Sequence, residues 1–315
     1  MVPKQTLRRW CAGLRVRACA AVAILGVAGF LAVATRSASA QGSPPVRVRA
    51  GFMGAYLMPP RPGNPPPPGI GPAYRAYEII TGTDMRQRPW GFAQCLREVL
   101  VKASGDPRLR NDPRVAALAA HADRFVAGFT YADMMAGIPL HDDQGTYDRP
   151  YKLTVYFDPA RIDAVLAQLG ERPWRGVRPV IVPVLLVRGL KPPPYVLSAH
   201  IPEGADQRGS FVNAAHEFGL RVRFPGKAEL GAWGASAERF PSRAARLPAG
   251  QMPSEMVVLG TLRWNETLPG WIGRWRTRWH GVVYAWGVSG VTYDDAFRDI
   301  ARGVLLLAAG HGPPN

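Results

Sequence analysis

The apolar run from Pro179 to Val187 constrains the fold of this chain more than any other segment. A strand with one face in water alternates apolar and polar side chains, whereas a strand buried on both faces is apolar throughout. The prolines at residues 192–194 end the run. It is therefore predicted to be a strand in the middle of a sheet.

The residues around this strand predict a second α/β unit over residues 176–310. Alternating side chains predict a hairpin between Trp271 and Ser289, with its turn near His280-Gly281. The other elements expected in this unit are a helix, a strand and a closing helix, over Gly209–Phe218, Glu255–Leu262 and Tyr293–Leu307.

A first unit is predicted over residues 74–175, with the order β-α-α-β-α. Its expected strands are Ala76–Ile80 and Lys152–Phe157. Helices are expected over Pro89–Lys102, from Asp112-Pro113 to about Phe129, and from Asp158-Pro159 onward, since Asp caps a helix and Pro suits its first turn. The fold class is thus α/β of the α+β sandwich type: two small layered units of mixed sheet packed with helices.

The first 40 residues have the pattern of a secretory signal. A basic region is followed by an apolar run from Ala18 to Ala34, and Ala38 and Ala40 match the small residues of a cleavage site. We expect cleavage there, which places the protein in the periplasm and leaves no stable transmembrane segment; an uncleaved anchor is the alternative. A Pro/Gly-rich stretch over residues 41–73 is predicted to be a disordered linker.

Export changes the meaning of the charge and of the cysteines. The chain carries 39 Lys and Arg against 23 Asp and Glu, a net charge of +16. Six of the basic residues and no acid lie in the first 40, so the rest keeps 33 basic residues, a net charge of +10. Cys95 alone remains after cleavage, which excludes an intramolecular disulfide, and its helical position predicts a small buried hydrophobe.

Several motifs occur in a distinctive order along the chain. The main one is the segment Gly91–Asp106, a helix followed by Ser-Gly-Asp. The others are Asp112-Pro113, Phe157-Asp158-Pro159, Arg172-Pro173-Trp174, Arg178-Pro179, Asn213–Leu220 and a strand with Gly260 before the tryptophan hairpin. In this order they resemble a bacterial envelope family called domain of unknown function 2066, from about Tyr77 to Leu306. The resemblance implies an uncharacterised periplasmic protein and no particular reaction.

The first strand of the hairpin carries the clearest candidate site. Alternate residues of a strand face opposite sides, so Trp271, Trp275 and Trp279 share one face. The other face holds Arg274, Arg276, Arg278 and His280, which could bind phosphate or carboxylate groups of envelope polymers or lipid headgroups. The ordinary alternative is that the indoles cover the core and the arginines are merely solvated.

A second candidate lies in the polar loop before Lys152, where His141, Asp142 and Asp148 offer an imidazole and carboxylates for a metal or a hydrolytic base. Their spacing matches no metal motif, so a solvated loop is equally consistent with them. Adjacent His216 and Glu217 point about 100° apart on a helix and do not form a metal pair. Thr81–Asp84 lacks the signature of a phosphate-binding loop and is interpreted as a capped turn.

These observations favour a non-catalytic binding or scaffold protein of the cell envelope, with no cofactor and no bound metal. Its partner is expected to be another envelope protein or an anionic polymer, and the compartment disfavours nucleic acid. Two alternatives stay open. One is an enzyme acting on an acidic envelope substrate, possibly with a metal at His141, Asp142 and Asp148; the other is a polymer or membrane-surface binder that uses the arginine side of the strand.

Overall fold

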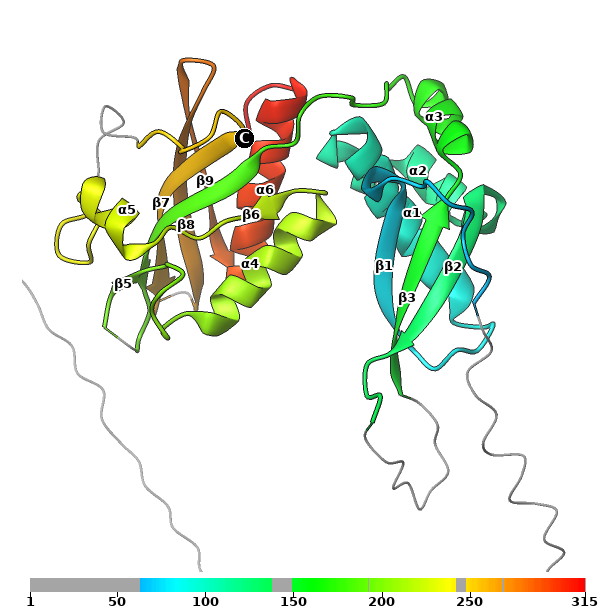
Figure 1. The fold of residues 1–315 in the computed structure, drawn as a ribbon, viewed down its shortest axis with the longest axis horizontal. Helices are drawn as coiled ribbons and strands as arrows, with labels where there is room; N and C mark the ends of the chain where they lie inside the picture. Colours follow the sequence, from blue (N-terminus) through cyan, green and yellow to red (C-terminus); the bar gives the residue numbers. More distant parts are fainter. Residues whose placement is uncertain (1–62, 138–148, 192, 242–247, 268, 315) are drawn as a thin grey trace, which may run out of the picture. The chain divides into compact units, whose positions relative to one another are not determined.

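Two sheets packed with helices make up the described part of this computed structural model (Figure 1). The structure describes residues 63–137, 149–191, 193–241, 248–267 and 269–314. Mixed helices and strands on two sheets confirm the predicted fold class. Most buried side chains of the two sheets share one large hydrophobic core, and a smaller apolar cluster lies on the other face of the second sheet.

The first sheet has three antiparallel strands in the order β1-β3-β2. Helix α1 packs on β1 and β3, and its buried face includes Cys95, Leu96 and Val99. Burial raises the pKa of the Cys95 thiol well above its usual range, which agrees with the predicted inert hydrophobe. The elements in chain order are β1 (Arg75–Thr81), α1 (Arg88–Ser104), α2 (Pro113–Ala119), β2 (Val126–Asp133), β3 (Pro150–Phe157) and α3 (Pro159–Gln168).

The predicted helix from Asp112-Pro113 to Phe129 is wrong in its second half. Asp112 does cap α2, because its carboxylate accepts a hydrogen bond from the backbone N–H of Arg114 at 2.8 Å. The helix ends at Ala119, and residues from Val126 onward form β2, which pairs with β3. Apolar residues in this segment fit a helical spacing, but β-branched and aromatic side chains next to a partner strand favour the ladder. The order is therefore β-α-α-β-β-α.

The end of the expected linker lies against the free edge of β2. The backbone N–H of Phe129 donates to the carbonyl of Asn64 at 2.6 Å, and Pro66 lies so close to Gly128 that a Cβ there would come within 2.6 Å of it. Proline cannot extend a ladder, so this segment covers an edge strand without offering a new one. Residues 63–73 are thus part of the described fold, although their composition predicts a linker.

The second sheet has six strands in the order β5-β4-β7-β8-β9, with β6 also on β4. β4 and β7 are parallel, whereas β7, β8 and β9 form an antiparallel meander. The elements are β4 (Val180–Arg188), β5 (Tyr195–Val196), α4 (Ala205–Glu217), β6 (Arg221–Val222), α5 (Lys227–Ala232), β7 (Glu255–Asn265), β8 (Gly270–Trp279), β9 (Val282–Val291) and α6 (Tyr293–Ala309).

The apolar run predicted to lie in the middle of a sheet is β4, which is buried on both faces. Ile181 and Leu185 join the core on the side of α4 and α6, while Val182 and Val184 join a smaller cluster with Leu230 of α5. Pro183 lies in this strand without disrupting it. On the edge of β4 opposite β7, β6 pairs only at Val180–Ile181 and β5 only at Leu186–Val187, so Pro183 lies in the interval between them.

Candidate functional site

β8 presents a row of arginines on one face and buried side chains on the other. Arg274, Arg276 and Arg278 are exposed, whereas Trp275 and Thr277 between them are buried. We call the three arginines the arginine face. Alternate residues of a strand are roughly 6.6 Å apart, so the Cα atoms of the three arginines follow the strand at about this spacing. The alternation predicted from the sequence is the one that the structure shows.

His280 does not belong to this face. β8 ends at Trp279, which pairs with Val282, so only His280 and Gly281 form the loop. Their φ angles of 47° and 81° are both positive, as a two-residue hairpin turn requires. The predicted assignment of His280 to the arginine side of the strand is therefore wrong, because the turn ends the alternation one residue earlier.

Two tryptophans on the inner face hold β8 and β9 against α6. The indole N–H of Trp275 donates to the carboxylate of Asp299 at 3.0 Å, and that of Trp286 donates to the carbonyl of the same residue at 3.3 Å. Gly260 and Gly273 leave the space that the Trp275 ring fills, since a Cβ on either would come within 2.5 Å or less of that ring. The arginine face is therefore mounted on a strand whose other side is tightly packed.

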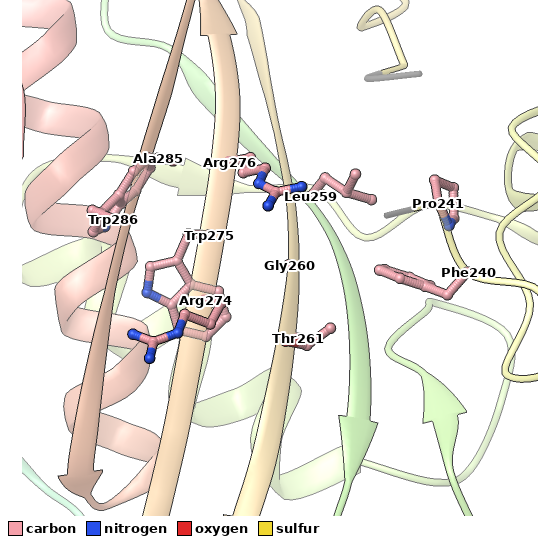
Figure 2. A pocket seen from close by; sticks show the side chains of 10 residues that line it. All are labelled: Phe240, Pro241, Leu259, Gly260, Thr261, Arg274, Trp275, Arg276, Ala285 and Trp286. Atoms are coloured by element: carbon pink, nitrogen blue, oxygen red, sulfur yellow. The ribbon is translucent and has the colours of Figure 1, made fainter. Parts of the chain in front are cut away.

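A groove of about 410 Å³ runs beside the arginine face (Figure 2). Leu259 and Thr261 of β7 and Arg276 of β8 point from the sheet toward Phe240 and Pro241, which lie opposite them. Arg274 and Ala285 complete the sheet side of the groove. The groove thus combines guanidinium groups with an apolar wall. Phe240 and Pro241, which form this wall, are distant from β8 in the sequence, so no local sequence pattern predicts that they lie there.

The loop candidates lie outside the described residues. His141, Asp142 and Asp148 fall in residues 138–148, so their prediction stays open, and with it the enzyme alternative. The residues that flank this segment are tied together, because Arg149 pairs with Asp133 at 2.9 Å. The turn after β1 contains an Asp84 carboxylate that accepts hydrogen bonds from the backbone and side chain of Arg86, which agrees with a capped turn.

A polar depression of about 340 Å³ gathers charged residues that the sequence did not bring together. Glu217 of α4 pairs with Arg298 of α6 at 2.9 Å and with Arg110 at 3.5 Å, and the His216 ring lies 5.0 Å from that of Tyr77. Glu98 of α1 also lines it. His216 and Glu217 thus have different partners within this depression.

The imidazole of His216 is expected to stay neutral at neutral pH. Burial is the main cause, and the positive charges of Lys102, Lys152 and Arg75 add to it, which together lower its pKa to about 4. An unfolded chain would bind the proton near pH 6.5, so this group supports folding fully above that pH and progressively less as the pH falls toward 4.

We expect an NMR titration midpoint well below 6, and less loss of stability between pH 6.5 and 4.5 in His216→Gln than in wild type. A midpoint near 6.5 would contradict this.

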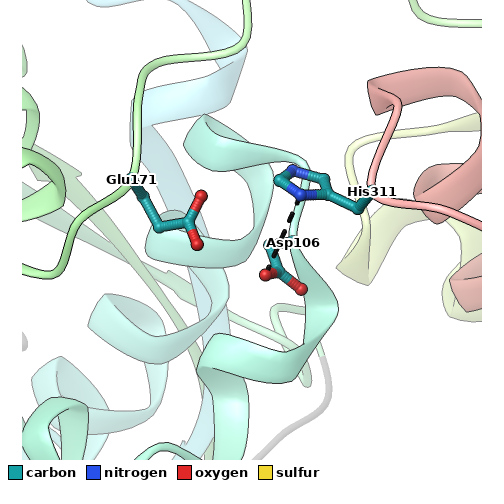
Figure 3. A group of neighbouring side chains, drawn as sticks. All are labelled: Asp106, Glu171 and His311. Atoms are coloured by element: carbon teal, nitrogen blue, oxygen red, sulfur yellow. Dashed lines mark ion pairs between the residues drawn. The ribbon is translucent and has the colours of Figure 1, made fainter.

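A second cluster joins the end of α1 to the end of the chain (Figure 3). Asp106, Glu171 and His311 have ligand atoms within 4.8 Å of one another, a set that could hold a metal ion. Arg108, however, donates to both carboxylate oxygens of Asp106, at 2.8 and 2.7 Å. Burial opposes ionisation of Asp106, yet these bonds hold its pKa below its usual range. We therefore interpret the cluster as a structural tie.

The Ser-Gly-Asp motif at this place has a local structural role. Gly105 ends α1 in the left-handed region with φ 78°, and Asp106 accepts the backbone N–H of Arg108 to cap the short 3₁₀ helix Pro107–Asn111. The Nε2 atom of His311 lies 3.3 Å from the carbonyl oxygen of Ser104. These residues end one helix and begin the next, and many unrelated sequences use the same residue types for this purpose.

Comparison with known families corrects the resemblance drawn from these motifs. Residues 70–175 match a domain of unknown function, DUF8605. This is a different family from domain of unknown function 2066, so the identification with that family is wrong. The main motif used for that identification is the helix-capping Ser-Gly-Asp sequence just described. The match spans about a third of the chain, namely the first sheet and its helices, and stops before the arginine face.

No curated protein and no solved structure matches the chain. Among the described residues, no helix has both the length and the apolar composition needed to cross a membrane.

Proposed function

We propose that this chain is an exported, non-catalytic binding protein of the bacterial cell envelope, and that its arginine face binds phosphate or carboxylate groups of an envelope component. One observation carries the proposal. Three exposed arginines alternate along one strand, and two of them, Arg274 and Arg276, line a groove of about 410 Å³ on a sheet fixed from behind by Trp275 and Trp286. Guanidinium is the group best suited to bind such anions in a bidentate manner.

The fold supports binding by this face because it makes the arginines rigid in position while leaving them exposed. Their strand is paired on both sides, by β7 and by β9, so the backbone under the arginine face is held by two ladders. A preorganised row loses less entropy on binding than the same residues in a loop. The excess of basic residues outside the first 40 residues favours an anionic partner as well.

The test is binding to a soluble polyanion. We expect long-chain polyphosphate to bind the wild-type protein in a salt-sensitive manner, and the triple variant Arg274→Ser/Arg276→Ser/Arg278→Ser to bind on the order of tenfold or more weakly. Fluorescence anisotropy of labelled polyphosphate at 50 and 500 mM salt measures both effects.

A matched control removes the same charge elsewhere. Arg86, Arg161 and Arg175 are exposed and lie outside β8, so replacing all three by Ser changes the net charge equally. We expect this control to bind nearly as wild type does. Equal losses in the two triple variants would show that binding follows net charge alone and would overturn the proposed site.

A further inference from the structure

The far end of the β8–β9 hairpin carries exposed apolar side chains in place of the polar residues usual at a turn. Val282 follows the turn and is 52% exposed, while Val177 and Met252 nearby are 77% and 51% exposed. Val177 and Met252 line one depression of about 620 Å³ together with Trp279 and His280. We call Val177, Met252, Trp279 and Val282 the apolar tip.

These residues are distinguished by lying close together. A single exposed valine or methionine is ordinary, but a contiguous apolar surface marks a place of contact. The turn residues His280 and Gly281, each with a positive φ, make a tight two-residue loop, so the hairpin ends abruptly at Trp279 and Val282. The hairpin thus contributes Trp279, partly buried against the core, and exposed Val282, while Val177 and Met252 lie beside Trp279.

The apolar tip meets the arginine face at the end of β8. Arg278 and Trp279 face opposite sides of the strand, but both line one depression of about 550 Å³ together with Met252. The pairing partner of Arg278 on β9 is Val283, which is itself 39% exposed. Of the described residues that line the two depressions beside the tip, only Glu255 has a carboxylate, and this side chain is buried and pairs with Arg223 at 2.6 Å. The exposed charge next to the apolar tip is therefore positive.

An anionic bilayer surface accommodates one particular combination of groups. Apolar side chains and an indole lie at the end of the hairpin, and a row of arginines lies further along the same strand. Apolar side chains enter the boundary between headgroups and acyl chains, and tryptophan prefers this interface. Arginine keeps its charge among the headgroup phosphates, which attract basic residues near the surface. A soluble polyanion would use the arginines but has no place for the apolar tip.

We propose that the apolar tip docks this protein onto the surface of an anionic lipid bilayer, with the arginine face binding the headgroup phosphates. The arginine part rests on the proposed function, and the tip adds the source of the anion. Docking of this kind is peripheral: it uses the end of a hairpin and requires no spanning segment.

The test measures binding to vesicles of phosphatidylglycerol with phosphatidylcholine, and to vesicles of phosphatidylcholine alone, by co-sedimentation at 50 mM salt. We expect wild type to prefer the anionic vesicles. Met252→Ser/Val282→Ser should weaken that binding roughly tenfold while leaving polyphosphate binding unchanged. The triple arginine variant should weaken vesicle binding on the order of 100-fold, at roughly fivefold for each arginine, and polyphosphate binding as well.

The control is Met134→Ser/Val212→Ser, which replaces a methionine 53% exposed and a valine 47% exposed at other places on the fold. We expect it to bind both vesicles as wild type does. The first 40 residues are common to all variants, so the differences report on the tip.

The two proposals fail in different ways. Vesicle binding that is the same in the tip variant and in its control would overturn the docking proposal, even if polyphosphate still bound. Absence of wild-type vesicle binding together with intact polyphosphate binding would also overturn it, and would point to a polymer or protein partner instead. If the wild-type protein does not bind polyphosphate, the proposed function is overturned, whatever the vesicles show.

Discussion

Replacing Trp275 by alanine is expected to lower the free energy of unfolding by about 3–5 kcal/mol, the usual cost of removing a large aromatic side chain from a core. Trp275 is 1% exposed and fills the space left by Gly260 and Gly273. Its loss leaves a cavity between the sheet and α6, and it removes the indole donor to Asp299. The second sheet should therefore lose the packing that holds the arginine face.

Urea unfolding followed by circular dichroism measures this effect. Trp90→Ala is the matched control, because Trp90 is 50% exposed at the start of α1 and its truncation creates no cavity. We expect the control to change the free energy of unfolding by less than about 1 kcal/mol. Similar losses in the two variants would contradict the packing described for β8.

Glu98→Gln is expected to lower the free energy of unfolding by about 3 kcal/mol, because it leaves a buried ammonium group without its counter-charge. Glu98 and Lys102 form an ion pair one turn apart on α1, with side chains only 12% and 2% exposed. Burial raises the pKa of Glu98, and the charge of Lys102 opposes this rise. Lys102 also donates to the Arg75 carbonyl at 3.2 Å, which connects α1 with β1.

Two further variants separate a missing partner from a general loss of packing. Glu98→Gln/Lys102→Met removes both charges and should recover much of the lost stability, since a buried pair often does no better than apolar groups of similar size. Asp84→Asn breaks the exposed Arg86–Asp84 pair and is expected to change the free energy of unfolding far less than Glu98→Gln does, because solvent screens an exposed pair. A double variant less stable than Glu98→Gln alone, in thermal and urea unfolding, would contradict this account.

The family comparison shows how far capping motifs can be used. Asp112, Asp158 and Gly105 lie where the sequence predicts helix ends, and Asp158 accepts the backbone N–H of Ala160 at 2.8 Å. These residues report backbone geometry correctly. The same geometry is needed in every fold that joins helices this way, so the motifs located the elements well and identified the family wrongly.

Patterns within one strand or one helix turn were sufficient to predict the fold class, the buried strand β4, the hairpin turn near His280-Gly281 and the exposed arginines of β8. They depend on side-chain period and on local φ preferences, which neighbouring residues determine by themselves. The arginine half of the candidate site could therefore be predicted without a structure.

Only the tertiary structure decided the rest, because it depends on residues distant in the sequence. Pairing with β3 made residues 126–133 a strand, although their apolar spacing also fits a helix. Packing brought Phe240 to the arginine face, Met252 to Trp279, and Glu98 to a depression shared with His216 and Glu217. Local sequence determines which face each side chain takes on its own element; long-range packing determines what that face meets.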